Sequence, residues 1–131
     1  MTYIYYDCNI MIMKCLSKIL LLFVVATTVI PGDAYSYTDR STAVLRVLNK
    51  AAGKAQTVRV PVENSINFEK LTITARSCKQ TDPFDAENHF AFIEISEPAQ
   101  GQIFGGWMNK NEPGKNPLQN PDYDVWLVAC E

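Results

Sequence analysis

Short runs of β-branched and aromatic residues alternate with polar residues along most of the chain from residue 43 onward. In 56–62 (QTVRVPV) three valines alternate with Thr57, Arg59 and Pro61, and 71–78 (LTITARSC) repeats the alternation of apolar and polar residues. A period of two is typical of a β-strand with one buried face. We find no run that keeps a helical period over three turns, so the pattern predicts strands.

Six segments fit this pattern and are separated by turn residues such as Gly53. Pro61 lacks a backbone N–H and therefore places its strand at a sheet edge, whereas 89–96 is apolar on both faces in its first half and is expected in the centre of a sheet. So many short strands predict an all-β fold, a small antiparallel β-sandwich, with a closed or partly open β-barrel as the alternative. The six segments are 43–49, 56–62, 71–78, 89–96, 103–109 and 123–130.

A basic and then apolar segment precedes these strands. Two lysines are followed by an uncharged stretch, 19–30, and small residues then lead to a predicted cleavage after Ala34. As a helix that stretch would span roughly 18 Å, which is too short for a hydrocarbon core of ~30 Å, so a transmembrane anchor is disfavoured. We expect 1–34 to be a secretory signal peptide, with translation starting at Met11 or Met13. The mature chain would be periplasmic or secreted, with no stable membrane insertion.

The remaining residues are expected to form one domain. Residues 35–42 are polar and are predicted to be a loose lead-in, and 43–131 a single β-domain. A chain of 131 residues with 47 % hydrophobic residues suffices for one core. The formal net charge is −2, with acidic and basic residues interspersed, which disfavours nucleic acid as a partner.

Signal cleavage would remove two of the four cysteines and leave Cys78 and Cys130. An oxidising compartment favours their pairing, and two cysteines pair in one way. The predicted disulfide would close a loop of about 50 residues and contribute roughly 4 kcal/mol on the chain-entropy argument. Two thiols and one histidine are too few ligands for a closed zinc site, and we expect no cofactor.

The titratable residues show no catalytic motif. Asp82, Asp85 and Glu87 are weak candidates for a hard cation such as calcium, but their spacing does not match an EF-hand, so no metal site is predicted. His89, the single histidine, has no G-x-S-x-G nucleophile elbow to serve as a base. It is expected to be a hydrogen-bonded structural residue.

Two functional hypotheses are considered first, an enzyme and a structural subunit. An envelope enzyme acting on a polymer could use paired carboxylates, for example Glu94 with Asp124, although the sequence does not fix the separation that such chemistry requires. A purely structural subunit of an envelope complex is the other. We lean away from an enzyme because no catalytic constellation is recognisable.

The C-terminal region favours a third hypothesis. It holds both tryptophans and a proline-rich loop. Two glycines leave space beside Trp107, whereas Trp126 shares a strand face with Val128 and is expected in the core. Aromatic residues at an exposed face are typical of binding hot spots. We therefore predict a non-catalytic binding or adaptor module that contacts an envelope protein or glycan through the loop from Trp107 to Asp124. The candidate contact residues are Trp107, Met108, Asn109, Tyr123 and Asp124.

Several stretches together carry a resemblance that covers the whole mature domain. They are the opening AVLRVLNKAAGKAQTVRVPV, FEKLTI, FIEI, the Gly106-Trp107-Met108 run, and PDYDVW ahead of Cys130. On these stretches the segment from Val44 to Glu131 resembles DUF2155, a family of small exported bacterial proteins. The resemblance implies export and a cysteine pair. It implies no activity, substrate or catalytic residue.

Overall fold

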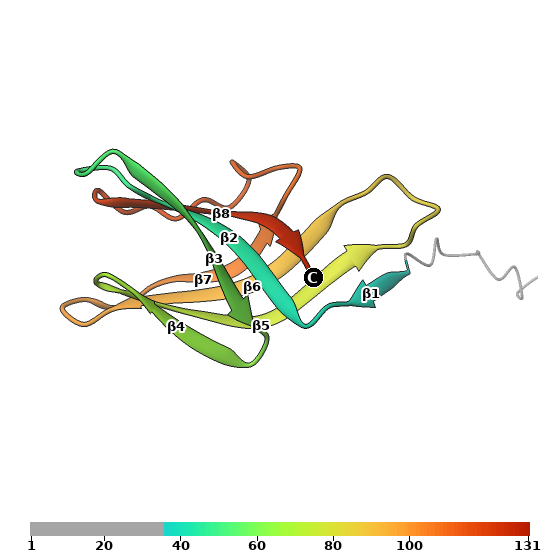
Figure 1. Cartoon of the computed structure of the whole chain (residues 1–131), viewed down its shortest axis with the longest axis horizontal. Helices are drawn as coiled ribbons and strands as arrows, with labels where there is room; N and C mark the ends of the chain where they lie inside the picture. Colours follow the sequence, from blue (N-terminus) through green and yellow to red (C-terminus); the bar gives the residue numbers. More distant parts are fainter. Residues whose placement is uncertain (1–35) are drawn as a thin grey trace, which may run out of the picture. The chain divides into compact units, whose positions relative to one another are not determined.

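The computed structural model describes residues 36–131, which form eight β-strands and no helix (Figure 1). The predicted signal peptide, 1–34, lies outside the described residues. In the described part no helix could span a membrane. The strands are β1 (Tyr37–Asp39), β2 (Thr42–Asn49), β3 (Lys54–Pro61), β4 (Asn64–Phe68), β5 (Leu71–Thr81), β6 (His89–Glu97), β7 (Gly101–Asn109) and β8 (Tyr123–Cys130).

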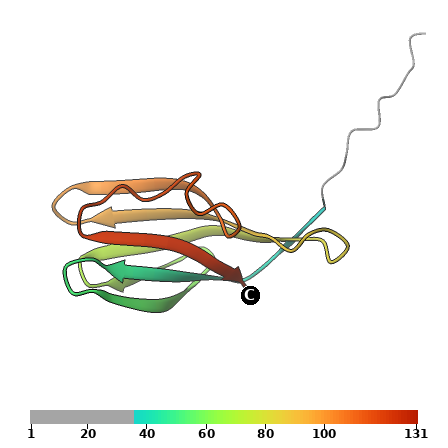
Figure 2. The same cartoon turned by 90° about the horizontal axis from the view of Figure 1, so that it is seen from above.

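The strands form two antiparallel sheets that do not close into a barrel, so the predicted β-sandwich is confirmed. One sheet has the order β1-β5-β6-β7, with β4 also paired to β5, and the other has the order β3-β2-β8. Figure 2, seen from above, shows how the strands of the two sheets overlap. β3 lies at an edge, as Pro61 indicates, and β6 lies inside the larger sheet, as predicted.

The core lies between the sheets and follows the period-two pattern. β5, β6 and most of β8 bury alternate side chains. The larger sheet supplies buried residues such as Ile73, Ile93 and Ile95, and the smaller sheet supplies Leu45 and Leu127. The opposite faces of both sheets point outward.

Two strands were not predicted from the sequence. The expected loose lead-in, 35–42, contains β1 and the first residue of β2, and 64–68 forms β4. Both pair with β5, which runs to Thr81 and is longer than predicted: β4 pairs with its first half and β1 with its last residues. These short strands owe their structure to the edge of β5, and a local pattern does not reveal that edge.

The predicted disulfide between Cys78 and Cys130 is confirmed. It joins β5 of the larger sheet to β8 of the smaller sheet, with a Cα–Cα distance of 5.6 Å and a sequence separation of 52. On the chain-entropy argument, a loop of that length contributes roughly 4 kcal/mol to stability. The bond fixes one end of the sandwich.

Candidate functional site

Aromatic side chains from three strands meet on the outer face of the larger sheet. The β6–β7 register places Phe92 opposite Trp107, and their rings pack edge to face with centroids 5.5 Å apart. Tyr37 of β1 meets Phe90 of β6 in the same way at 5.7 Å. We call these four residues, Tyr37, Phe90, Phe92 and Trp107, the aromatic face. Edge-to-face packing holds the rings in place and leaves part of them open to solvent.

The aromatic face is unusually exposed. Within residues 36–131 three large hydrophobic side chains are exposed, and two of them belong to this face: Trp107 at 46 % and Tyr37 at 45 %. The third, Phe84 at 98 %, lies in the loop between β5 and β6. Single exposed apolar residues are ordinary, but clustered ones mark contact surfaces. The cluster around Trp107 is therefore the strongest candidate site on the domain.

Two grooves run across this face and share Phe90 and Trp107. The first holds about 260 Å³ and is completed by Tyr37 and Lys79. The second holds about 240 Å³ and is completed by loop residues, among them Pro113 and Lys115, together with Asn109 and Asn116. The linings include two lysines and no carboxylate. A ligand with an apolar side chain and a negative charge would fit such a surface.

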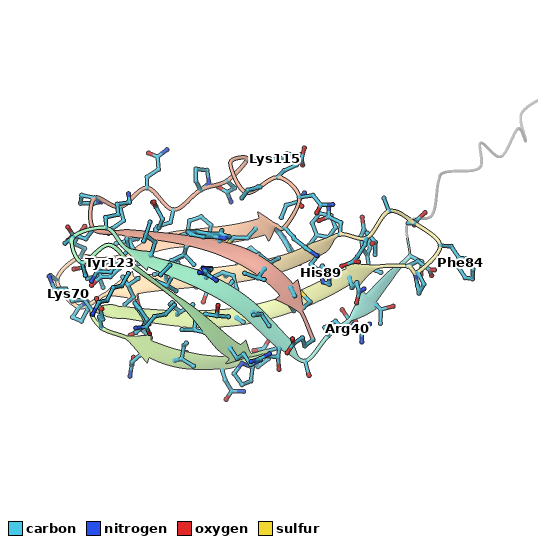
Figure 3. The ribbon with its side chains drawn as sticks, turned by 45° about the horizontal axis from the view of Figure 1, so that its top comes forward. Arg40, Lys70, Phe84, His89, Lys115 and Tyr123 are labelled. Carbon is cyan, nitrogen blue, oxygen red and sulfur yellow. A yellow bond between two sulfur atoms is a disulfide. The ribbon has the colours of Figure 1, made fainter. Side chains whose placement is uncertain are left out.

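The loop 110–122 borders the second groove and is anchored at several points. Leu118 and Asn120 are buried within it. The Asn120 side-chain oxygen accepts the backbone N–H groups of Asp122 and Tyr123 at 2.8 and 3.0 Å. Figure 3 shows Lys115 on this loop, toward the same end of the domain as His89, with Tyr123 at the opposite end. The loop thus presents Lys115 beside the groove from a fixed position.

A family model matches residues 43–130. The chain belongs to the DUF2155 family. That family is described as an uncharacterized protein conserved in bacteria, and the resemblance found in the sequence is confirmed. No curated protein and no solved structure matches the chain. The matched segment of this DUF2155 chain includes both cysteines of the disulfide and three members of the aromatic face, while Tyr37 lies outside it.

The expectation that Trp126 belongs to the core is wrong. In this DUF2155 domain Tyr123, Val125 and Leu127 face the core, so Trp126 points outward and is half-buried. It borders a hollow of about 460 Å³ beneath the prolines of the loop. The register between β2 and β8 shifts near the end of β8, which turns Cys130 inward. The face that Trp126 shares with Val128 is therefore the outer one.

The candidate contact residues are divided by burial. Met108 and Tyr123 face the core at 4 % and 3 % exposure. The Tyr123 hydroxyl donates to the Glu69 carboxylate at 2.7 Å, and this hydrogen bond raises the pKa of Tyr123. Asn109 borders the second groove, whereas Asp124 pairs with Lys50 at 2.8 Å and borders the hollow at Trp126. The structure thus brings Asn109 and Trp107 together and places Asp124 on the other sheet.

The paired carboxylates of the enzyme hypothesis are also on different sheets. Glu94 lies on the outer face of β6 and binds Arg76 at 2.8 Å, and Asp124 lies on the outer face of β8 with its own lysine partner. Since the outer faces of a sandwich point in opposite directions, the two carboxylates do not line one cleft. Each neutralises a neighbouring cation instead.

His89 is buried and hydrogen-bonded on both ring nitrogens. Its Nδ1 accepts the Cys130 backbone N–H at 3.0 Å, and its Nε2 contacts the Glu87 carboxylate at 3.1 Å. This pattern assigns the proton of the neutral ring to Nε2. The ring supports the strand end that carries the disulfide, in agreement with the structural role predicted for it.

The acidic loop does not gather its carboxylates. Glu87 pairs with Lys110 at 3.0 Å, and the Asp82 side chain accepts the Phe84 backbone N–H at 3.2 Å. The hydrogen bonds from Lys110 and from His89 lower the pKa of Glu87. Within residues 36–131 no three histidine, cysteine or acidic side chains are placed to hold a metal ion.

Sequence reasoning identified Trp107 from its glycine neighbours but missed Tyr37, Phe90 and Phe92. A usable signal was present, because Phe90 and Phe92 share one face of β6 with Glu94. A charged residue in that alternation indicates an outer face. Tyr37 carried no such signal, since β1 takes its place only through pairing with β5.

Proposed function

We propose that this protein is an exported module of the bacterial cell envelope that binds an envelope protein or glycan without catalysing a reaction. Its contact surface is the aromatic face together with the adjoining end of the loop, Asn109 to Asn116. The observation that carries the proposal is the 46 % exposure of Trp107 at the centre of two adjoining grooves.

Export is supported by the disulfide. Such bonds persist in oxidising compartments and are rare in the cytosol. The bond between Cys78 and Cys130 is nearly fully buried within the domain, which suits a permanent structural role. Together with the predicted signal peptide, this favours the periplasm or the medium as the place of action.

Binding is supported by the way in which the aromatic face is held. Tryptophan and tyrosine supply large contact areas with few rotatable bonds, and such residues dominate the energetics of interfaces. Trp107 and Tyr37 are already oriented by their edge-to-face contacts with Phe92 and Phe90. A partner would therefore lose little free energy to ordering these side chains.

The proposal is tested by affinity capture from envelope extract with the full chain carrying a C-terminal tag. Trp107→Ala should lose the captured partner, while Phe84→Ala, which removes another exposed aromatic ring elsewhere, should retain it. Pelleting with purified cell-wall polymer distinguishes a glycan from a protein partner. Equal recovery with the wild type and Trp107→Ala would contradict the proposal.

A further inference from the structure

The edges of the two sheets differ in how they are protected against further strand pairing. Natural edge strands are usually short, charged, proline-containing or covered. β1 and β4 are three and five residues long. β3 carries Lys54, Arg59 and Pro61, and β8 is flanked by the loop 110–122. Each of these edges has a feature that discourages pairing.

The edge of β7 has fewer of those protections, because the loop 110–122 reaches it through the Asn116 side chain. The strand Gly101–Asn109 (GQIFGGWMN) is nine residues long and contains no charged residue and no proline. It pairs with β6 on one side and ends the larger sheet on the other. Gly105 is exposed and Gly106 half-buried, and neither carries a side chain of its own, so only the ends of the Gln102 and Asn116 side chains lie beside this stretch of backbone. This edge is open to another strand.

The hydrogen-bonding pattern shows which backbone groups are free. Lys110 N–H donates to the carbonyl at the start of β6 at 3.0 Å. In an antiparallel ladder, residues that are hydrogen-bonded to the neighbouring strand alternate with residues that are not. Met108 and Gly106 are therefore hydrogen-bonded to β6 as well, opposite Ala91 and Ile93. Gly105 and Trp107 lie between them and direct their N–H and C=O groups away from β6.

These outward groups have almost no partners in the described part of the chain. The Trp107 carbonyl accepts a hydrogen bond from the Asn116 side chain at 3.3 Å. No backbone hydrogen bond joins the loop, residues 110–122, to this edge within residues 36–131. The Asn116 amide thus occupies the place that the first N–H of an incoming strand would take.

The second groove adjoins the same edge. A strand paired with β7 would lie about 4.8 Å from it, with alternate side chains on the outer face of the sheet. The side chain opposite Trp107 would then meet the groove between Phe90, Trp107 and Pro113. Lys115 lies at that groove, and within residues 36–131 its ammonium group has one partner, an exposed ion pair with Glu112 at 3.4 Å. Exposed pairs contribute little, so a carboxylate of the partner can replace it.

We infer that the partner is an extended polypeptide segment that adds to the free edge of β7 as a further strand, with an apolar side chain in the groove at Trp107 and a carboxylate beside Lys115. Main-chain hydrogen bonds to Gly105 and Trp107 supply affinity, and the groove supplies specificity. This inference rests on the proposed binding function and selects a peptide over a glycan as the ligand.

The test uses acetylated and amidated hexapeptides of alternating sequence, with one aromatic residue and a glutamate on the same face. Binding is followed by the fluorescence of Trp107 in the full chain carrying Trp126→Phe. N-methylation then removes alternate N–H donors of a binding peptide. Because one set of amides faces β7 and the other faces solvent, methylating one set should weaken binding about tenfold or more and methylating the other should leave it within about twofold. Equal effects of both sets, or no binding by any peptide, would overturn strand addition.

A proline pair supplies the matched protein variants. Gly105→Pro removes a free N–H without breaking a bond to β6, and a Cβ at this site meets only the flexible end of the Gln102 side chain. Thr57→Pro makes the same change on β3, at a position in step with Pro61. Thermal melting first checks that both variants are folded. Gly105→Pro should then fail to bind the peptide, and Thr57→Pro should bind it. Retention by both would also overturn the inference.

The outcomes separate this inference from the proposed function. If Trp107→Ala abolishes capture of the envelope partner while both sets of methylated peptides bind alike, the binding function stands and strand addition fails. If Trp107→Ala changes nothing, the proposed contact surface itself fails.

Discussion

The two tryptophans occupy equivalent places in the two sheets and have different surroundings. Trp107 lies on the outer face of β7 and Trp126 on the outer face of β8, and each strand ends its sheet. Trp107 is 46 % exposed and contacts Phe92, whereas Trp126 is half-buried beside the prolines of the intervening loop. The loop borders both tryptophans, but of the two Trp107 alone stays exposed, so it is the one available to a partner.

The disulfide joins the two sheets that carry the tryptophans, and its removal should have the largest effect. Replacing Cys78 and Cys130 with alanine should lower the free energy of unfolding by about 2–5 kcal/mol, because the unfolded chain regains its freedom. Urea unfolding followed by tryptophan emission measures the change. Reduction of the wild type should reproduce it, and an unchanged urea midpoint after both treatments would contradict the prediction.

Leu118→Ala should separate the two tryptophans. Leu118 is buried at 4 % exposure and anchors the loop to the core, so its truncation should cost about 2–4 kcal/mol. The emission of Trp126, measured with Trp107→Phe, should shift to longer wavelength as its cover loosens. The emission of Trp107, measured with Trp126→Phe, should stay nearly unchanged. Equal shifts would show that the loop covers both residues alike.

Direct truncation should show a smaller difference in the same direction. Trp126→Ala should lower the free energy of unfolding by about 2 kcal/mol. The ring is half-buried, so its removal exposes less apolar area than the truncation of a core residue does. Trp107→Ala should cost about 1 kcal/mol, the size of one edge-to-face contact. Urea denaturation of both variants provides the measurement, with each Trp→Phe variant as a control. A larger loss for Trp107→Ala would reverse the comparison.

The smallest expected effect is a pH dependence at the start of the loop. Lys110 and His89 lower the pKa of Glu87 from its ordinary value of 4.5. A carboxyl with a lowered pKa adds stability above its ordinary value and loses it as the pH falls through the folded value. Stability measured by urea unfolding from pH 6 to pH 3 should therefore fall less steeply in Glu87→Gln than in the wild type.

Glu131 offers a matched control, because Arg59 lowers its pKa at a separate place on the domain. Glu131→Gln should independently reduce the loss of stability between pH 6 and pH 3, and the double variant should show the sum of both changes. If Glu87→Gln loses as much stability as the wild type between pH 6 and pH 3, the role assigned to the ion pair between Glu87 and Lys110 is contradicted.

The sequence predicted the sandwich because its main strands carry their own signal. Alternation in 71–78 and 89–96 marks strands whose inner faces form the core, and two cysteines that survive export have one possible pairing. β1 and β4 were missed because each is stabilised by the edge of β5 and not by its own pattern. Local alternation therefore identifies strands that bury a full face and overlooks short strands that complete an edge.

The site was predictable in part. Trp107 is exposed, although the ends of the Gln102 and Asn116 side chains fill the space beside its two neighbouring glycines. Period two cannot tell which of two apolar faces is the inner one, and Trp126 was assigned to the wrong face. Its cover depends on where Leu118 anchors the loop. The anchoring of Leu118 in the core depends on the folded structure, and the local sequence pattern does not predict it. Assembly of the aromatic face likewise depends on the register between β6 and β7.

The disulfide also makes a covalent ring of part of the chain. The ring from Cys78 to Cys130 contains β6, β7, the loop and every member of the aromatic face except Tyr37. A protease that cuts the loop once, for example after exposed Lys115, would open the ring without releasing a fragment. Under denaturing conditions the nicked protein would stay in one covalent piece until a reductant separates its two parts. The exposed loop beside the site can thus be cut while both sheets stay linked.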